Sequence, residues 1–185
     1  MVLWIVVAFL VGNVTGCFFG MGSTKLGKEL LEGMLATEQP ADVQRPRKLE
    51  RPGFSLRYPR NWMIDVEDED YDPDHLFMIN SPGSCYTMFT LYDVGSDSKK
   101  SVKEQLEHFS KLVSSPQTTK FEKWGNYSGH GSDLRGRLMG LRAGFKIFAH
   151  SSETRSFVVV NLCFDGDREF VGPGFDLIER TFALK

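Results

Sequence analysis

The sequence predicts an α+β domain in which a mainly antiparallel β-sheet is flanked by helices. From Phe54 onward, apolar and polar residues alternate over short segments, which is the pattern of half-buried strands. Two other segments place apolar residues three or four positions apart, as amphipathic helices do. Because turn residues separate consecutive strands, we expect hairpins, an antiparallel sheet and helices packed on its faces.

Eight strands are predicted from the alternation, in the order that the chain presents them. They cover residues 54–58, 63–66, 76–80, 86–93, 121–127, 133–141, 145–150 and 157–164.

The more regular of the two predicted helices covers residues 101–113, between the fourth and fifth strands. Ser101 and Glu104 have the spacing of a capping box at its start. The apolar residues that share one face of this helix are Val102, Leu106, Phe109 and Val113.

A second, shorter helix is predicted over residues 175–182, close to the carboxyl end. Pro173 and Gly174 mark its entry, because both residues commonly interrupt regular structure. Its inward-facing residues are Phe175, Ile178 and Phe182.

The chain begins with an apolar segment that contains no charged residue before Lys25. Residues 2–12 are too few to span a bilayer comfortably, but they suit the apolar core of a signal peptide. The segment ends at residues 14–17 (VTGC), which resemble the bacterial lipobox. The resemblance implies removal of residues 1–16 and attachment of lipid to Cys17.

The basic residue that normally opens a signal peptide is missing here. An uncleaved signal anchor that extends through Met21 is therefore the alternative. Both interpretations place the chain from Lys25 onward outside the cytoplasm or on a membrane surface. We expect lipid anchoring through Cys17 to the cell membrane, on its periplasmic or extracellular face.

The exported part divides into a tether over residues 17–52 and one globular domain over residues 53–185. Within the tether, residues 23–38 have the apolar spacing of an amphipathic helix. Residues 39–52 contain three prolines and four basic residues, which favours an extended, solvated linker. We expect the domain to be monomeric.

Three cysteines fit export. If Cys17 carries lipid, Cys85 and Cys163 remain as an even pair in an oxidising compartment, so a disulfide between them is one option. Two separate thiols in the core are the other, since free cysteine is among the most buried residue types.

Residues 54–62 (FSLRYPRNW) are similar to the opening motif of PsbP-like and Mog1-like domains. In that family the first strand turns at a proline, here Pro59, and a tryptophan, here Trp62, closes the core. The turn at residues 81–82 and the segment 174–182 follow in the family's order. Bacterial members include DcrB-like and LpqN-like lipoproteins. The resemblance covers the whole globular part and implies a non-enzymatic binding or assembly role.

Residues 65–74 hold seven carboxylates, and clustered oxygens are the ligands that hard cations prefer. Asp68, Asp70 and Asp72 match the first three ligand positions of an EF-hand loop. Pro73 stands where that loop needs glycine, however, and Ile79 stands where it needs glutamate. A solvated acidic hairpin is therefore favoured over a calcium site or a docking patch for a basic partner, and no metal cofactor is expected.

Ser128, His130, Ser132 and Asp133 include the residue types of a hydrolase triad. Because they lie within one turn-rich segment, they cannot easily surround a substrate from separate elements, and no catalytic residue is predicted. The isolated histidines, without a second ligand at metal-binding spacing, are interpreted as surface residues. They are His75, His108 and His150.

Residues 124–131 (WGNYSGHG) form the segment with the strongest signs of a contact surface. Trp124 and Tyr127 are common binding anchors, and the glycines allow close approach of a partner. The other interpretation, which we favour, is a strand end whose tryptophan belongs to the core.

The composition narrows the function further. With 22 basic and 24 acidic residues, the formal net charge of −2 offers no global attraction for nucleic acid. We expect a lipid-anchored, extracytoplasmic, non-enzymatic domain that binds or helps assemble a membrane-associated protein complex. An extracytoplasmic lipoprotein that binds a solute or divalent metal is the alternative, and an esterase-like enzyme using Ser128 or Ser132 with His130 is a third hypothesis.

Overall fold

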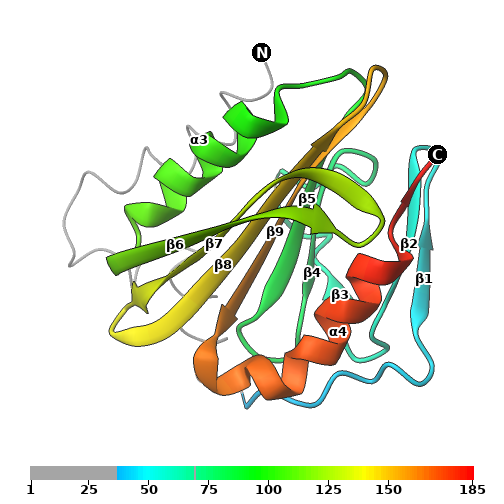
Figure 1. Ribbon diagram of the computed structural model, residues 1–185. Coiled ribbons are helices and arrows are strands. Elements are labelled where there is room, and N and C mark those ends of the chain that lie inside the picture. Colours follow the sequence, from blue (N-terminus) through cyan, green and yellow to red (C-terminus); the bar gives the residue numbers. More distant parts are fainter. Residues whose placement is uncertain (1–36, 69) are drawn as a thin grey trace.

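The computed structural model describes residues 37–68 and 70–185 (Figure 1). The predicted signal peptide, the lipidation residue Cys17 and nearly all of the predicted helix over residues 23–38 lie outside the described residues. Within the described ranges, no helix has the length and apolar character needed to cross a bilayer.

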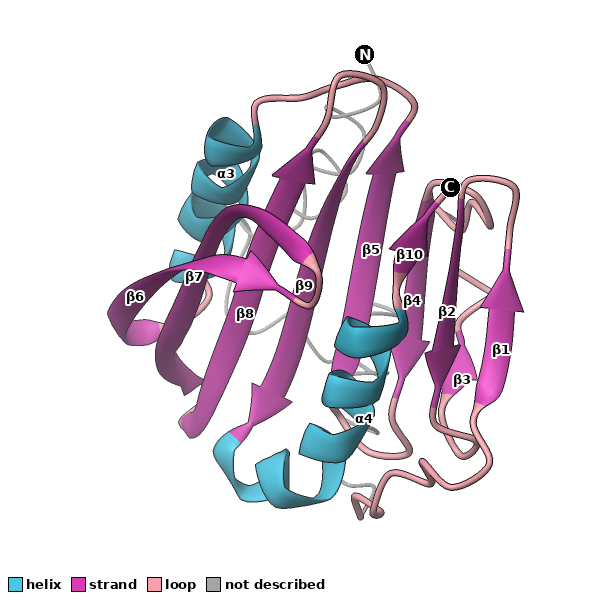
Figure 2. Ribbon diagram, turned by 45° about the vertical axis from the view of Figure 1, so that its right-hand side comes forward, coloured by secondary structure: helices cyan, strands magenta, loops and turns pink. Residues whose placement is uncertain are grey.

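One large antiparallel sheet and one small sheet make up the fold, with two α-helices packed against them (Figure 2). The large sheet contains, in spatial order, β3 (Met63–Ile64), β4 (Leu76–Asn80), β5 (Tyr86–Tyr92), β9 (Ser156–Phe164), β8 (Leu141–Ser151), β7 (Tyr127–Leu138) and β6 (Ser114–Trp124). The small sheet contains β1 (Arg47–Glu50), β2 (Phe54–Tyr58) and β10 (Ala183–Leu184). The predicted α+β class is confirmed.

The segment over residues 39–52 differs from the solvated linker that its composition suggests. It contains β1, which pairs with β2 in antiparallel register, Leu49 opposite Leu56. Leu49 is buried in the core, and the amide of Asp42 donates to the side chain of Asn61. Local composition could not show this docking, because the partners that satisfy the backbone lie in later parts of the chain.

Helix α3 (Ser98–Ser110) covers one face of the large sheet, which we call the outer face. The opposite face, which we call the inner face, is the one that packs against α4. It begins three residues before the predicted start, because Asp97 rather than Ser101 caps it: the carboxylate of Asp97 accepts from the Lys100 amide at 3.0 Å. Val102 and Phe109 then pack on β7, β8 and β9, as their spacing predicts.

Helix α4 (Arg168–Thr181) covers the inner face and follows the single-turn 3₁₀ helix η1 (Asp165–Asp167). It begins seven residues before the predicted start, so Pro173 lies inside it rather than at its entry. Gly174 permits close packing, since a Cβ there would lie 2.6 Å from the ring of Trp62. Trp62 itself is fully buried in the inner core.

The β6–β7 hairpin is longer than predicted, since β6 begins at Ser114 and Tyr127 opens β7 rather than ending the preceding strand. Its tip folds over the inner face, where the amide of Gly125 donates to the α4 residue Glu179 at 2.9 Å. Gly125 has a φ of +55°, and a Cβ there would collide with the Glu179 carbonyl oxygen. The tip is therefore anchored against α4.

Candidate functional site

Two thiols meet at the beginning of β5. The register that pairs Tyr86 with Leu162 places Cys85 directly opposite Cys163. Their sulfurs lie 2.9 Å apart, with the Cys85 thiol donating to Cys163 and the Cys163 thiol donating to the carbonyl oxygen of Phe164. Both cysteines are free and buried. The structure therefore brings together the two residues of the predicted pair.

A buried glutamate closes one side of this thiol pair. Glu38 is 8% exposed, and its carboxylate accepts three hydrogen bonds. The Ser81 hydroxyl donates to Oε2 at 2.6 Å, and the amides of Gln39 and Gly83 donate to Oε1 at 3.1 and 3.2 Å. Nothing in the local pattern around Glu38 indicates these contacts, since Ser81 and Gly83 lie more than forty residues away.

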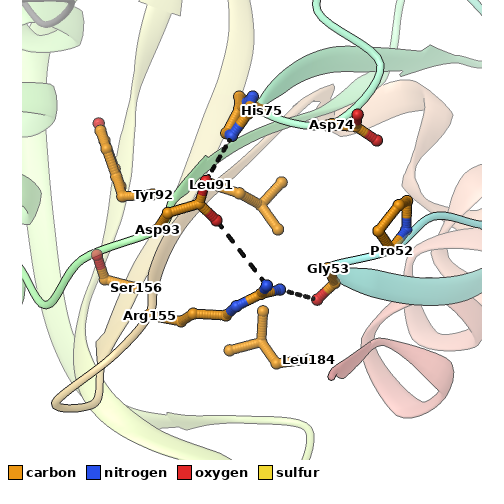
Figure 3. Close-up of a pocket in the computed structure, with 10 residues that line it drawn as sticks. All are labelled: Pro52, Gly53, Asp74, His75, Leu91, Tyr92, Asp93, Arg155, Ser156 and Leu184. Atoms are coloured by element: carbon orange, nitrogen blue, oxygen red, sulfur yellow. Dashed lines mark hydrogen bonds and ion pairs between the residues drawn. The ribbon is translucent and has the colours of Figure 1, made fainter.

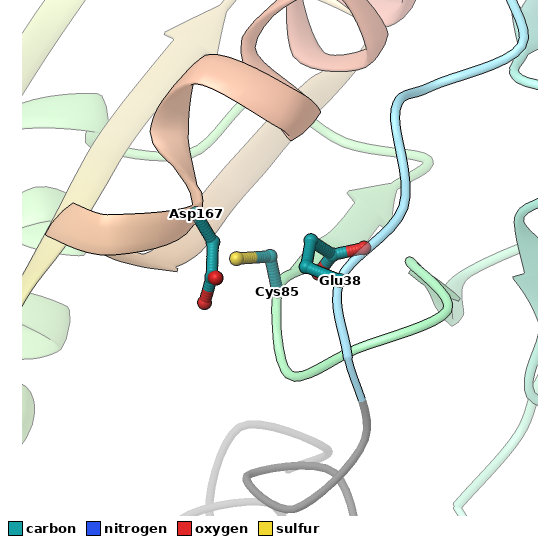
Figure 4. A group of neighbouring side chains, drawn as sticks. All are labelled: Glu38, Cys85 and Asp167. Carbon is teal, nitrogen blue, oxygen red and sulfur yellow. The ribbon is translucent and has the colours of Figure 1, made fainter.

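Asp167 approaches from the start of α4 and completes a cluster, which we call the thiol–carboxylate cluster: Glu38, Cys85, Cys163 and Asp167. Figure 4 draws three of its members, Glu38, Cys85 and Asp167. One ligand atom from each of Glu38, Cys85 and Asp167 lies within 4.8 Å of the others. Across residues 37–68 and 70–185, no other trio of histidine, cysteine and acidic side chains converges in this way.

The surroundings of Cys85 and Asp167 disfavour the ionised forms of these two groups. The hydrogen bond with Cys163, followed by burial, raises the pKa of the Cys85 thiol. Burial, with the nearby charge of Glu38, raises the pKa of Asp167. Cys85 is therefore held as a thiol and is a poor nucleophile. The arrangement suits oxidation of the two thiols to a disulfide, or a metal ion that displaces their protons.

A second polar cluster lies beyond the other end of β5 and lines a cavity of about 170 Å³ (Figure 3). Nδ1 of His75 lies 3.0 Å from Asp72, and Nε2 lies 3.1 Å from Asp93. Arg155 lies 4.0 Å from Asp93 and donates to the carbonyl oxygen of Gly53 at 2.8 Å. The cavity is smaller than the pockets that hold most organic ligands.

We call this second cluster of Asp72, His75, Asp93 and Arg155 the His75 cluster. Its opposite charges stabilise one another. The hydrogen bond to Asp93, with a further one to Asp72, raises the pKa of His75. The backbone hydrogen bond from Asp74 lowers the pKa of Asp72, and His75 adds to the effect. His75 thus bridges two carboxylates, so it is not isolated as the sequence suggests, although its side chain lies at the surface as predicted and is 43% exposed.

The acidic segment 65–74 folds into turns that use its own carboxylates. Asp68 accepts from the amide of Asp70 at 2.8 Å, and Asp72 accepts from the amides of Asp74 and His75 at 3.0 and 3.2 Å. These are side-chain turns typical of aspartate. Among the described residues, the calcium candidates Asp68, Asp70 and Asp72 do not converge on one point.

The residues considered for a hydrolase triad do not assemble on β7. His130 contacts Ser98 of α3, with Nδ1 2.9 Å from its Oγ. Successive side chains of a strand point to alternate faces, so Asp133 lies on the face of β7 opposite to that of His130. Asp133 pairs there with Arg135 at 2.8 Å. Ser132 is 4% exposed. The geometry therefore gives His130 no carboxylate partner from this set.

The remaining histidines serve local contacts. Nδ1 of His150 lies 2.8 Å from the carbonyl oxygen of Ser128. His108 stacks edge-on against Phe109, and burial lowers its pKa. The residue as a whole is partly exposed, as expected, and its Nε2 atom is buried without a hydrogen-bond partner among the described residues.

Of the two candidate partner contacts, Trp124 belongs to the core, as the favoured interpretation predicts, and Tyr127 is partly buried and packs against it. Trp124 is 1% exposed and packs among the rings of Phe89, Phe148, Phe157 and Phe182. The hydroxyl of Tyr127 accepts from the amide of Leu184 at 2.8 Å. The folded-over hairpin explains this burial, because it turns the end of β6 toward α4 instead of toward solvent.

No family model matches the sequence. No curated protein matches it either.

Solved structures show the fold. Cyanobacterial PsbP (CyanoP) from Synechocystis superposes on 77% of this chain and 94% of its own length, with a TM-score of 0.53 and 9% identity. A Bacteroides thetaiotaomicron protein superposes on 75% of this chain, with a TM-score of 0.51 and 14% identity. The match spans about half of that protein's length, 48%. LpqN, involved in cell envelope biogenesis of Mycobacterium tuberculosis, superposes on 76% of this chain and 90% of its own length, with a TM-score of 0.48 and 14% identity. The chain is thus similar in fold to PsbP.

Proposed function

We propose that this chain is a lipid-anchored, non-enzymatic domain that works outside the cytoplasm and binds or helps assemble a membrane-associated protein complex. In this proposal, lipid on Cys17 holds the domain at the cell membrane. The globular part then presents a binding surface to a protein partner.

The observation that carries the location is the thiol pair. Cys85 and Cys163 come from positions 78 residues apart, yet they face each other across neighbouring strands. Such a pair is stable as a disulfide in an exported protein, whereas cytosolic thiols are kept reduced. The pair therefore supports the export that the segment before Cys17 predicts.

The free edge of the large sheet supports a role in protein binding. Among the strands that the structure describes, β6 ends the sheet and pairs with β7 alone. Seven consecutive residues of β6, from Ser114 to Lys120, are exposed, so the strand is accessible along most of its length. An edge strand of this kind can accept an extended segment of a partner by strand addition. Fold likeness to cyanobacterial PsbP agrees with an accessory domain.

Two measurements test the proposal. The mass of the amino-terminal peptide purified from membranes should show lipid on Cys17, and the Cys17→Ser variant should lose it. A photo-crosslinker at Thr119 of β6 should capture a membrane protein, whereas one at Lys99, on the exposed start of α3, should not. An unmodified Met1 in the wild type would refute lipid anchoring through Cys17. Equal crosslinking at both positions would refute partner binding at the β6 edge.

A second candidate function is favoured by the thiol–carboxylate cluster. Thiolate and carboxylate ligands suit a zinc-like divalent ion, and the hydrogen bonds to Glu38 would orient its oxygens as outer partners of metal ligands commonly do. Metal binding would require Cys85 and Cys163 in their reduced form, so it competes directly with the disulfide.

Thiol counting separates the two candidates. Protein isolated without reductant and then unfolded should contain no reactive thiol at Cys85 or Cys163 if the disulfide forms. Two reactive thiols, together with a thiolate-to-metal absorption band on adding Cd²⁺ to the folded protein, would favour the metal site. The Cys163→Ser variant cannot form the disulfide, so its Cys85 thiol should react, and it should lose the absorption band with Cd²⁺.

A further inference from the structure

Three exposed large apolar side chains gather at one end of the molecule. Six such side chains are exposed among the described residues, and Met139, Leu141 and Phe170 are 50%, 50% and 41% exposed. Met139 and Leu141 lie at the β7–β8 turn, and Phe170 lies in the first turn of α4. Figure 2 shows this turn and the start of α4 at the same end of the sheet.

Arginines flank the exposed turn. Arg137 and Arg142 are directly opposite each other on β7 and β8, so their charges share one face. Like charges at opposite positions repel, and an anion between them relieves the repulsion. Arg137 donates to the carbonyl oxygen of Gly140 at 3.0 Å, while Arg142 has no ion-pair partner in the described part of the chain.

The two arginines border an open hollow of about 530 Å³, with Ser114, Ser115 and Gln117 as polar neighbours. Ser115 has a φ of +54°, a costly conformation for a residue with a side chain. The other two charged groups that line the hollow, Arg135 and Asp165, balance each other and lie 3.5 Å apart. The excess positive charge therefore rests on Arg137 and Arg142.

The same end receives the chain as it enters the domain. The amide of Ala41 donates to the carbonyl oxygen of Phe170 at 3.0 Å, and Glu38 lies beside Asp167. The described part of the chain begins at residue 37, only four residues before this contact with Phe170. Figure 1 shows its blue end near the start of α4. A lipid on Cys17 would be only about twenty residues of chain away from this surface.

We propose that this end, the β7–β8 turn with Arg137, Arg142 and Phe170, rests on the bilayer and binds anionic lipid headgroups. The apolar side chains enter the interfacial region while the arginines meet phosphate groups, as in other surface-bound elements. The inference rests on the proposed membrane anchor and adds an orientation to it. The opposite end of the sheet, with the His75 cluster, then faces away from the membrane.

The test uses the full chain with vesicles of phosphatidylcholine alone or of equal parts phosphatidylcholine and phosphatidylglycerol. Flotation on neutral vesicles measures the anchor, and hydrogen exchange of residues 137–142 measures the docked surface. We expect these amides to exchange more slowly on anionic than on neutral vesicles. Each arginine contributes about a fivefold change in binding, so Arg137→Gln with Arg142→Gln should weaken docking about 25-fold.

A matched control removes the same charge elsewhere. Lys99→Gln with Lys103→Gln, on exposed positions of α3, should leave the protection at the turn unchanged. Met139→Ser with Leu141→Ser should reduce protection on anionic vesicles without changing the melting temperature, because both side chains are half exposed.

Each result decides between the two proposals. Flotation on both vesicles without protection of residues 137–142 supports the anchor and overturns the docking surface. Flotation on anionic vesicles alone, lost in the double arginine variant, supports the surface and overturns the anchor. Absence of flotation on either vesicle overturns both. Protection seen only with protein-containing native membranes would assign the surface to a protein partner and overturn lipid binding.

Discussion

β5 has a polar cluster at each of its ends, and the two clusters differ in burial and in charge balance. The thiol–carboxylate cluster precedes the strand, where Glu38 and Cys85 are buried and, within residues 37–68 and 70–185, neither Glu38 nor Asp167 forms an ion pair. The His75 cluster follows the strand, where two acids are matched by His75 and Arg155 and the side chains are partly exposed. The first cluster is thus built from groups that respond to oxidation or metal, and the second from groups that respond to pH.

The difference shows how one strand can present different chemistry at its two ends. The hydrogen bond with Cys163 and burial favour the neutral thiol of Cys85, which makes Cys85 a poor nucleophile but leaves the two sulfurs close enough to join. Exposure to solvent allows charged pairs at the other end, and each such pair contributes little to stability by itself. We therefore expect the largest energetic effects at the thiol end.

Oxidation of the thiol pair should have the largest effect. A disulfide across 78 residues should stabilise the domain by about 2–5 kcal/mol, so adding a reductant to oxidised protein should lower the melting temperature by about 10 °C. Cys163→Ser should melt at one temperature with or without reductant. Equal melting of wild-type protein in both conditions would contradict the disulfide.

Loss of Glu38 should come next. Glu38→Ala would leave the Ser81 hydroxyl and the Gly83 amide without their acceptor, which should lower the free energy of unfolding by about 1–3 kcal/mol in urea titrations. Glu38→Gln keeps one acceptor oxygen and should lose less. Glu67→Ala, at an exposed acid, is the control and should stay within about 0.5 kcal/mol of wild type.

The His75 cluster should show a smaller, pH-dependent effect. Because the folded state raises the pKa of His75, its stabilising contribution is complete below the ordinary histidine pKa and disappears as pH rises through the raised value. His75→Gln should therefore melt below wild type at about pH 5.5 and together with it at about pH 8.5. A melting difference that does not change with pH would show that the ion pairs are not responsible.

Calcium should have the smallest effect. Because the carboxylates of Asp68 and Asp72 already accept backbone hydrogen bonds, adding calcium or a chelator should leave the melting temperature unchanged. Asp70→Asn should behave like wild type in both conditions. A rise in melting temperature with calcium that Asp70→Asn abolishes would restore the site considered from the sequence.

Patterns within short segments predicted the larger elements well. Alternation located strands 54–58 and 76–80 at their observed bounds, and apolar spacing identified the face of α3 that packs on the sheet. The start of α4 was predicted wrongly because Pro173 is tolerated inside that helix. Strand β1 was missed because its partner, β2, follows after a break in the pattern.

The sequence determined the features that depend on neighbouring residues, and the tertiary structure determined the contacts between distant ones. Alternation and helical spacing are properties of neighbouring residues, so the fold class and most strands were available from the sequence. The meeting of Cys85 with Cys163, the three donors around Glu38 and the burial of Trp124 arise only when distant segments pack together. Spacing along the chain carries no information about such contacts, because strand register and the folding of the β6–β7 hairpin over α4 set them.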